Sequence, residues 1–290
     1  MKRLSNWLKD SYSQTIQFLC LLVAFLLPSA LNLQSVIPVP DGFDLNLFGL
    51  AEYLAIKGGN IGIGILLVGV SVVMLHKRNR SKTLNKGNAY HTHGMTWYRF
   101  CSKVLGYGAC SLVRVPIAMQ FLLVLNDTFE TYDYGDVYEE LDADSNVRVS
   151  RYSAAKGAYS SGQAGWVSLV ISDTYPIEFE QLPPDRGKDI IIAISRLSNQ
   201  TSRVRRYSRH LVDTVTTVVR DLPPGSRVNV FATTNPKNTY EIIDKAFKLG
   251  GRDNLNALYV YRQHHCGAED NWDFTDPVKI YDRSSGRQRQ

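Results

Sequence analysis

The sequence has few cysteines: four in 290 residues, Cys20, Cys101, Cys110 and Cys266. None of them forms a CxxC pair, and their spacing matches no metal-ligand pattern. Four scattered cysteines do not make a disulfide framework, so we expect a reducing compartment for the soluble part of the chain.

Signatures of common enzymes are also missing, since there is no GxGxxG, GxxxxGK[ST], GxSxG or HExxH. The run His264-His265-Cys266 resembles a metal cluster, but we expect it in a polar loop, where adjacent histidines point to different sides. We therefore predict no metal site, no cofactor and no catalytic residue, and binding in preference to catalysis. Hydrolysis of a nucleotide or NAD, with Asp173 as the acid, stays open as an alternative.

Basic residues outnumber acidic ones, 33 to 27, which gives a formal net charge of +6. Such a balance is typical of proteins with an anionic partner. Part of it has a local cause, because eight basic residues flank two apolar segments: Lys2, Arg3, Lys9, Lys77, Arg78, Arg80, Lys82 and Lys86. A positive flank beside a membrane is a topology signal, so no direct DNA or RNA binding is expected.

The two apolar segments cover residues 16–33 and 58–75 and contain no charged residue. Each has close to the roughly 18 to 20 residues that cross a bilayer. Gly62 and Gly64 in the second segment would allow close helix contact. A cleaved signal peptide is the alternative for the first segment, but the stretch is long and no small-x-small site closes it. We predict a transmembrane hairpin within residues 1–88.

Lysine and arginine set the orientation of such a hairpin. They gather before the first span and after the second, whereas the loop between has only Lys57. This pattern predicts that both termini are cytoplasmic. His91 and His93 follow the second span in a basic loop, where we expect them to be solvated.

Residues 104–125 are long enough to be a third span, but Arg114, Pro116 and Gln120 interrupt them. An arginine near the bilayer centre costs about 2.5 to 3.5 kcal/mol. The alternatives are a buried strand or a helix at the membrane surface within a connector of residues 89–165. A third span would place the following domain on the other side of the membrane.

Short apolar strands alternate with amphipathic helices after the connector. The expected strands are residues 166–171, 189–194, 227–232, 257–261 and a last edge strand at 278–281. The expected helices are residues 202–220 and 238–249. This order predicts an α/β domain over residues 166–283, Rossmann-like with a mostly parallel sheet, followed by a disordered tail at 284–290.

Polar residues follow three of the predicted strands. In a parallel sheet these strand ends share one edge, where ligands bind. Each set could also be a helix cap or turn. Two sets lead into helix N-termini, which favour anions, and basic side chains stand nearby. The candidate ligand-binding residues are Asp173, Ser195, Arg196, Ser198, Asn199, Thr233, Thr234, Asn235 and Lys237.

The stretches "IAIS", "RVNVFATTNPKNTYEIIDKAF" and "ALYVYRQ" make residues 166–282 similar to the SAVED and CARF domains. The resemblance implies a sensor of cyclic oligonucleotides from bacterial antiphage systems. It also implies that the loops at 195–201 and 233–238 hold the ligand. Some SAVED effectors carry two membrane spans before the sensor, which fits this layout.

The first expected function is therefore a bacterial inner-membrane effector. A cytoplasmic domain would bind a cyclic nucleotide, assemble into a homo-oligomer and disrupt the lipid bilayer through the two spans. The alternative is a structural or interaction subunit of a membrane complex, whose α/β domain recruits a protein partner.

Overall fold

The computed structural model describes residues 11–37, 46–86, 89–135, 147–153, 165–196, 206–249, 254–265 and 272–283. The chain forms two compact units. The first unit comprises residues 1–111 and 129–133, and the second comprises residues 112–128 and 134–290. The chain therefore passes between the units at three places.

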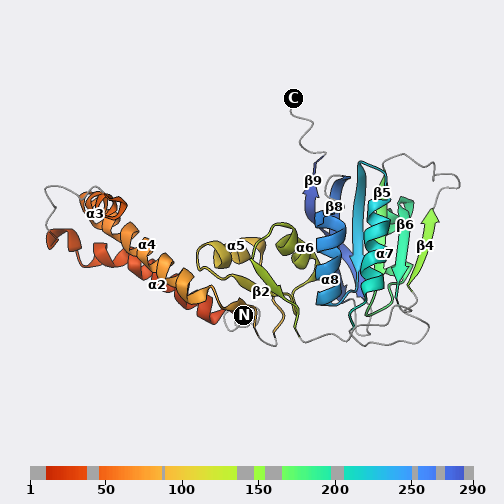
Figure 1. Cartoon of the computed structure of the whole chain (residues 1–290), viewed down its shortest axis with the longest axis horizontal. Helices are drawn as coiled ribbons and strands as arrows, with labels where there is room; N and C mark the ends of the chain where they lie inside the picture. The colour runs from red at the N-terminus through yellow and green to blue at the C-terminus, as the bar shows by residue number, and fades with distance from the viewer. Residues whose placement is uncertain are drawn as a thin grey trace, which may run out of the picture. The chain divides into compact units, whose positions relative to one another are not determined.

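The first unit contains a pair of long helices and a small sheet (Figure 1). Its helical elements are α2 (Tyr12–Ala30), η1 (Leu33–Ser35), α3 (Leu47–Lys57), α4 (Gly59–Asn79) and α5 (Met95–Lys103). Its strands are β1 (Thr83–Leu84), β2 (Ala109–Ser111) and β3 (Thr131–Asp133), which pair in this order and in parallel. The sequence patterns predicted neither this sheet nor α3.

Helices α2 and α4 are long and apolar enough to cross a membrane, with 19 and 21 residues. Most of their apolar side chains are exposed, as expected of helices that face lipid. Helix α2 begins and ends earlier than the predicted segment, and α4 continues four residues further, to Asn79.

Two glycines of α4 allow close approach of neighbouring helices. A Cβ on Gly64 would stand 2.6 Å from the backbone oxygen of Phe25 in α2. A Cβ on Gly62 would stand 2.1 Å from the backbone oxygen of Ala55, which belongs to α3 and not to the other span. Gly64 thus serves the predicted hairpin contact, and Gly62 serves the turn between α3 and α4.

A cluster of buried side-chain amides joins the N-terminal part of α2 to the C-terminal end of α4. The Asn79 side chain has no solvent exposure, and its Nδ2 donates to Gln17 Oε1 and to the Leu105 carbonyl oxygen, both at 2.7 Å. Gln17 Nε2 in turn donates to the Tyr107 hydroxyl at 3.2 Å. Buried polar groups need such partners, so this cluster ties both helices to the segment that leads into β2.

The histidines after α4 differ from expectation. His91 and His93 are buried, not solvated, and their rings lie 6.4 Å apart. Ser11 Oγ hydrogen-bonds to His93 Nε2 at 3.2 Å, and the Trp97 ring lies 5.8 Å from the His93 ring. Packing against α5 accounts for the burial, because an aromatic neighbour covers the imidazole.

The second unit is a six-stranded sheet with helical segments packed against it. Its strands are β4 (Arg148–Ser153), β5 (Trp166–Ser172), β6 (Ile190–Ser195), β7 (Ser226–Ala232), β8 (Leu255–His265) and β9 (Trp272–Asp282). Its helical elements are α6 (Ile117–Leu125), η2 (Phe179–Gln181), η3 (Pro184–Lys188), α7 (Arg209–Arg220), α8 (Pro236–Ile242) and the π-helix η4 (Ile243–Leu249).

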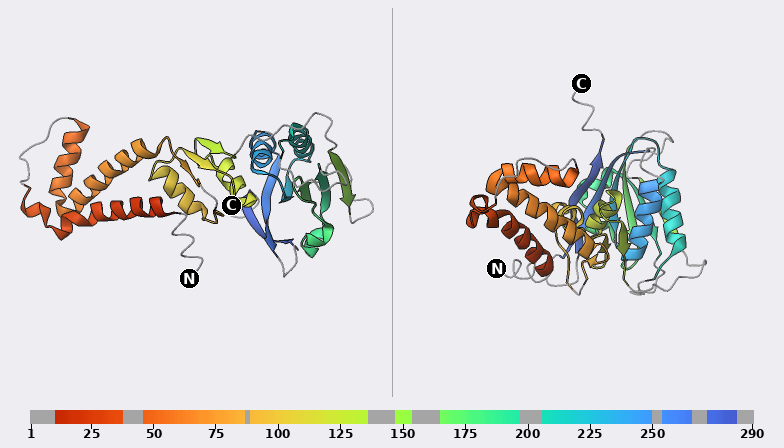
Figure 2. Two further views of the ribbon diagram at one scale, coloured as in Figure 1. Left: turned by 90° about the horizontal axis from the view of Figure 1, so that it is seen from below. Right: turned by 60° about the vertical axis from the view of Figure 1, so that its left-hand side comes forward.

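The strand order is β4-β6-β5-β7-β8-β9. The four central strands are parallel, as predicted, but both edge strands run antiparallel, so the sheet is mixed. Helices α7 and α8 cover one face, and η3 lies on the other (Figure 2). The core of the second face is a cluster of apolar side chains: Val170, Leu182, Phe231, Tyr261 and Phe274.

The segment 104–125 is not one continuous helix. It contains β2, a turn at Arg114 with φ of 59°, and the nine-residue helix α6 after Pro116. Nine residues span roughly 14 Å at 1.5 Å per residue, about half of a bilayer core of roughly 30 Å. Gln120 turns inward and donates to the Val115 carbonyl oxygen at 2.8 Å. Helix α6 packs on α8, η4 and β8.

Helix boundaries in the second unit differ from the predicted ones because of caps. Helix α7 begins at Arg209, since Ser208 Oγ accepts a hydrogen bond from the Leu211 amide at 3.2 Å, and Tyr207 lies before the helix. Helix α8 begins at Pro236, not at Asn238, with Asn235 as its N-cap. Proline at the first helical position suits this start.

The antiparallel edges were the least predictable part of the sheet. Strand β4 lies in the expected connector, and β9 is longer than the predicted edge strand. His264 and His265 lie in β8 and not in a loop, because β8 extends to pair with β9 as a long hairpin.

The amide cluster leads to a first prediction. Asn79→Ala would leave Gln17 Oε1 and the Leu105 carbonyl oxygen without their donor, which costs about 1–3 kcal/mol for a buried group. We expect a melting temperature several degrees lower for the full chain in detergent micelles. Asn60→Ala is the matched control on the same helix, since its hydrogen bonds are exposed. Equal melting temperatures for the two variants would contradict a stabilising role of the cluster.

Candidate functional site

The ends of β5, β6 and β7 meet at one edge of the sheet. The Arg196 amide donates to the Ser172 carbonyl oxygen, and the Thr174 amide donates to the Thr233 carbonyl oxygen, both at 3.0 Å. From β5 the chain moves to β6 on one side, and from β6 it crosses back to β7 on the other. The edge is therefore a topological switch point, the place where open α/β sheets bind ligands.

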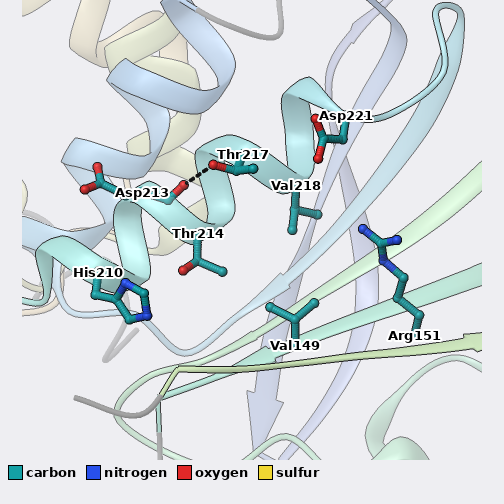
Figure 3. Close-up of a pocket in the computed structure, with 8 residues that line it drawn as sticks. All are labelled: Val149, Arg151, His210, Asp213, Thr214, Thr217, Val218 and Asp221. Carbon is teal, nitrogen blue, oxygen red and sulfur yellow. Dashed lines mark hydrogen bonds between the residues drawn. The ribbon is translucent and has the colours of Figure 1, made fainter. Parts of the chain in front are cut away.

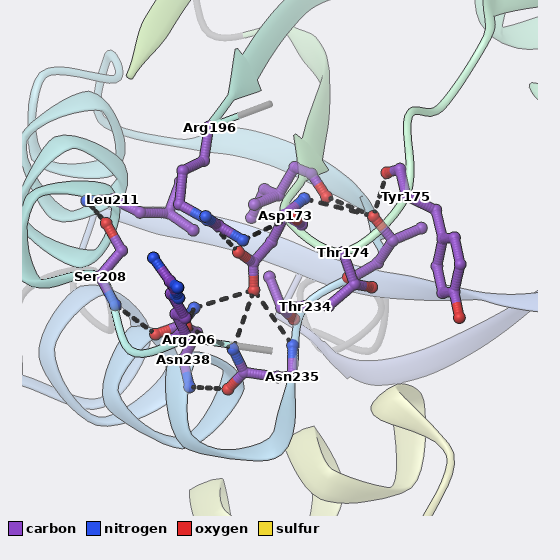
Figure 4. A network of polar contacts seen from close by, with 12 residues as sticks. Asp173, Thr174, Tyr175, Arg196, Arg206, Ser208, Leu211, Thr234, Asn235 and Asn238 are labelled. Atoms are coloured by element: carbon purple, nitrogen blue, oxygen red, sulfur yellow. Dashed lines mark hydrogen bonds and ion pairs between the residues drawn. The ribbon is translucent and has the colours of Figure 1, made fainter. Parts of the chain in front are cut away.

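Asp173 is the centre of this edge (Figure 4). Its side chain has no solvent exposure. Oδ1 faces Arg196 Nε at 2.6 Å, and Oδ2 accepts from the Asn235 amide, Asn235 Nδ2 and Asn238 Nδ2 at 3.2, 3.2 and 2.8 Å. A carboxylate offers about four lone-pair sites, and these donors fill most of them. The arrangement suits a positioning group better than a proton acceptor.

Arg196 is held from one side only. Its Nε and Nη2 contact Asp173, the latter through the backbone oxygen at 3.0 Å. Within the described part of the chain, its Nη1 makes no hydrogen bond, and the side chain keeps 8 % of its surface exposed. A guanidinium presents five N–H donors in a fixed fork. Asp173 thus orients Arg196 and leaves one edge of its fork available.

Asn235 and Asn238 join Asp173 to two helix starts. Asn235 Oδ1 accepts from the Asn238 amide at 2.9 Å, which caps α8. Asn238 Oδ1 accepts from the Ser208 amide at 3.1 Å, just before α7. Both Nδ2 groups also donate to the Arg206 carbonyl oxygen. The same amides therefore fix the entries to α7 and α8.

The hydroxyls of Thr233 and Thr234 are used inside the fold. Thr233 Oγ1 donates to the Tyr175 carbonyl oxygen at 2.7 Å and accepts from the Asp173 amide at 3.3 Å. Thr234 Oγ1 hydrogen-bonds to Thr239 Oγ1 at 2.7 Å. Both threonines are buried. These contacts favour the capping interpretation for the two residues.

Lys237 lies one residue into α8, among aromatic rings. Its Nζ is 4.3 Å from the Tyr134 ring centroid and 5.4 Å from that of Tyr207, and it pairs with Glu241 at 2.6 Å. Burial alone would lower the pKa of Lys237, but the hydrogen bonds to Glu241 and Tyr134 outweigh it and raise the pKa. Lys237 therefore stays a cation beside the edge.

The remaining predicted residues divide into two groups. Ser195 ends β6, where it pairs with Ser172 of β5. Ser198 and Asn199 lie outside the described residues. Asn238 was predicted only as a helix start, although it contacts Asp173 directly. Its spacing of three residues from the cap Asn235 is the signal that could have placed it here. Among described residues, no group of three or more His, Cys, Asp or Glu could hold a metal ion.

Comparison with known proteins identifies the family. The profile described as "SMODS- and Ubiquitin system-associated 2TM effector domain" matches residues 1–272. The chain belongs to this family. The match covers both units, so the helix pair and the sheet are parts of one effector. Together with the two apolar helices, it makes this 2TM effector a membrane protein.

No curated protein sequence matches the 2TM effector. Among solved structures it is similar to the Cap4 SAVED/CARF-domain containing receptor of Acinetobacter baumannii with the cyclic trinucleotide 2'3'3'-cAAA, at a TM-score of 0.38 and 6 % identity. The similarity covers 64 % of this chain and 41 % of that receptor, less than half of its length.

The 2TM effector also has a shallow groove away from the Asp173 edge, between α7 and β4 (Figure 3). Its volume is about 540 Å³. Its lining mixes charges of both signs with small residues: Val149, Arg151, His210, Asp213, Thr214, Thr217, Val218 and Asp221. None of the predicted ligand-binding residues lies in this groove.

A second prediction concerns Asp173. Asp173→Asn would leave Arg196 as a buried cation facing an amide, and removal of one partner of a buried pair costs about 3–5 kcal/mol. We expect a large loss of unfolding free energy for the full chain, measured by thermal unfolding in detergent. Asp213→Asn is the control, because this exposed aspartate lies 3.7 Å from Arg209 and such pairs contribute about 0–1 kcal/mol. A small loss with Asp173→Asn would show that the edge does not depend on its charge.

Proposed function

We propose that the protein is a bacterial inner-membrane effector of antiphage defence. Its second unit, a Rossmann-like domain on the cytoplasmic side, binds a cyclic nucleotide at the Asp173 edge. Ligand binding drives assembly into a homo-oligomer, and the two spans then disrupt the bilayer. The basic flanks of α2 and α4 support this orientation, and the effector family supports the role.

One feature carries the proposal: the guanidinium of Arg196, which Asp173 holds through Nε and Nη2 and whose Nη1 makes no hydrogen bond with the described residues. Arginine is the preferred partner of phosphate because its fork matches two oxygens at once. Lys237, at the start of α8, adds a second cation. A cyclic nucleotide supplies the phosphodiester that this pair would bind, in agreement with the sequence resemblance to SAVED and CARF sensors.

The Asp173 edge is better suited to binding a nucleotide than to hydrolysing it. The Asp173 carboxylate is occupied by Arg196, Asn235 and Asn238, so it is poorly placed to take a proton from a substrate or water. We therefore propose a sensor and not a nucleotide hydrolase. A sensor changes state only if the ligand binds the assembled form more tightly than the resting form.

The route from the edge to the membrane unit runs through α8 and η4. Helix α8 starts at the Asn235 cap and continues directly into the π-helix η4. Phe247 of η4 packs on Phe121 of α6, with ring centroids 5.3 Å apart, and Lys248 pairs with Asp127 after α6. π-Helical segments are rare and concentrate at functional sites.

Helix α6 is the covalent link in this route. Along the chain, α6 follows β2 and precedes β3. These two strands are neighbours in the sheet of the first unit, whereas α6 belongs to the second unit. A displacement of η4 would move α6, and α6 would act on both strands through short connections. We propose this path as the means by which the ligand controls the spans.

The third prediction tests the ligand site. Arg196→Lys keeps a cation beside Asp173 but removes the fork that would hold a phosphate. Charge-assisted hydrogen bonds contribute about 1.5–3 kcal/mol, so we expect binding weaker by roughly ten- to a hundredfold. Isothermal titration of the full chain in nanodiscs with cyclic di- and trinucleotides would measure it.

Arg209→Lys is the control for this experiment, since Arg209 is an exposed arginine of α7 and undergoes the same substitution. It should bind as the unmodified chain does. The proposal fails if no cyclic nucleotide gives heat with the unmodified chain, or if Arg196→Lys binds with unchanged affinity.

The fourth prediction tests the route through α6. Phe121→Leu keeps the helix apolar but removes the ring that packs on Phe247. We expect unchanged nucleotide affinity and a strong decrease in ligand-induced dye release from proteoliposomes. Phe274→Leu is the matched control: it is equally buried, packs on Phe231 on the other face of the sheet, and should retain dye release. Equal dye release from the two variants would exclude α6 as the route.

An exposed sheet edge supports the second candidate function, recruitment of a protein partner. Strand β4 is an edge strand, and its Val149 and Tyr152 are 42 % and 47 % exposed. Exposed edges accept an additional strand from another chain. A stoichiometric partner protein in pull-downs from solubilised membranes, with no nucleotide released on denaturation, would favour this function over the first.

A further inference from the structure

The two edge strands of the large sheet differ in how well they could accept a further strand. Strand β9 contains Pro277, and its pairing with β8 shifts register at two places. Prolines and bulges are the means by which proteins protect an edge strand from further pairing. Strand β4 has neither, since every residue from Arg148 to Ser153 pairs with β6 without a shift. Among the described strands, none pairs with its outer side.

The side chains of β4 alternate between the two faces of the sheet. Val149 and Arg151 line the groove beside α7 (Figure 3). The even-numbered residues therefore lie on the opposite face, where the Tyr152 ring packs edge-on against the Phe179 ring, with centroids 4.9 Å apart. Tyr152 is nevertheless 47 % exposed, and Arg148 on the same face is exposed as well. The edge thus presents an arginine on each face and an aromatic ring on one.

A second copy of β4 is a partner that fits this edge. A two-fold axis perpendicular to the sheet pairs a strand with itself in the antiparallel sense, and such isologous contacts are the commonest in protein dimers. Residues opposite each other then share a face of the sheet, so the axis passes through a residue. The registers centred on Ser150 and on Arg151 pair the most residues of β4.

Charge decides between these two registers. With Arg151 on the axis, the two copies of this arginine lie directly opposite each other, and like charges in that position destabilise a sheet. With Ser150 on the axis, Arg148 lies opposite Tyr152 of the second copy, and Arg151 lies opposite Val149. An arginine over a tyrosine ring makes a favourable cation–π contact, and the symmetry forms it twice.

The groove beside β4 adds charge complementarity. In the register centred on Ser150, Arg151 of the second copy lies next to Val149 and so beside the part of α7 that lines the groove. This lining contains two carboxylates, Asp213 and Asp221, and the side chain of Asp213 is 56 % exposed. The added strand therefore brings a cation to a surface that carries acidic residues.

We propose that β4 is a dimer contact, in which the strands of two copies pair antiparallel about a two-fold axis at Ser150 and join two sheets into one. The proposal names a surface for the homo-oligomer and rests on that part of the proposed function. It does not involve Asp173 or Arg196, and the contact forms without a nucleotide. An isologous contact closes at the dimer, so any larger assembly uses another surface.

Disulfide trapping can test this register without any ligand. Cys20 and Cys266 are first replaced by serine, whereas Cys101 and Cys110 stay, because both thiols are buried and burial raises the pKa of Cys101 to about 12. The Ser150→Cys full chain is then oxidised with copper phenanthroline in phosphatidylcholine–phosphatidylglycerol liposomes. Opposite Cβ atoms lie about 4.5–5.5 Å apart, close to the roughly 3.5–4.5 Å of a disulfide. We expect a dimer on non-reducing gels that dithiothreitol removes.

Tyr152→Cys is the matched control on the same face of β4. Its two copies would lie four residues apart along the strands, roughly 14 Å, which is too far for a disulfide. Tyr152 is more exposed than Ser150, so random collision would favour the control. We expect several-fold more dimer from Ser150→Cys. A mixture of Arg148→Cys and Tyr152→Cys chains should also form dimers, although neither variant does so alone.

As much dimer from Tyr152→Cys as from Ser150→Cys would overturn the proposal, and so would the absence of dimer from both. The oxidation is repeated in membranes of the cells that produce the protein. A disulfide between Ser150→Cys and a different protein, in place of the dimer, would assign the edge to a recruited partner and also overturn the proposal. Because no nucleotide is added, a negative result leaves binding at Arg196 untouched, and a failed titration would leave the dimer contact untouched.

Discussion

A carboxylate without solvent contact persists only where hydrogen-bond donors replace the water it has lost. Asp173 obtains its donors from three places: Arg196 after β6, Asn235 before α8, and Asn238 in the first turn of α8. Because these donors come from separate elements, satisfying one charge fixes the ends of two strands and the entry to a helix. The geometry of the whole sheet edge depends on this requirement.

The same network reaches beyond the edge through shared amides. Asn238 accepts from Ser208, the cap of α7, while it donates to Asp173. Asn235 caps α8 with its oxygen and donates with its nitrogen. A change at Asp173 would therefore be felt at the starts of two helices. Polar networks of this kind hold one arrangement firmly as long as every member is satisfied.

Sequence patterns located the central strands well, because a strand that is buried on both faces must be a continuous apolar run. The run "WVSLVI" corresponds to β5, and "DIIIAI" corresponds to β6 within one residue. The edge strand β4, "RVSRYS", is half solvated, and its mixed composition resembles that of a connector. The position and direction of an edge strand depend on its partner strand more than on its own residues. The antiparallel pairing of β4 with β6 and of β9 with β8 was therefore not predicted.

The candidate site was predictable in its parts but not in its roles. The order strand, polar turn, helix placed Asp173, Arg196 and Asn235 at one edge. It could not tell which side chains would face inward, and the structure uses Thr233 and Thr234 for internal contacts. The Tyr134 contact of Lys237 joins residues far apart in the sequence, which no local pattern encodes.

The connection between the two units follows from chain order alone. A single flexible linker would let the sheet unit move without consequence for the spans. Here the chain passes between the units three times, and two of these passages enclose α6. Phe121 anchors α6 in the core of the second unit. The segment from β2 to α6 and the segment from α6 to β3 are therefore both attached to a helix that is fixed in the second unit. Strands β2 and β3 are neighbours in one sheet, so a shift of that helix acts on the pair together. A fold that returns to its membrane unit through a packed helix can therefore couple the Asp173 edge to the spans by short covalent connections.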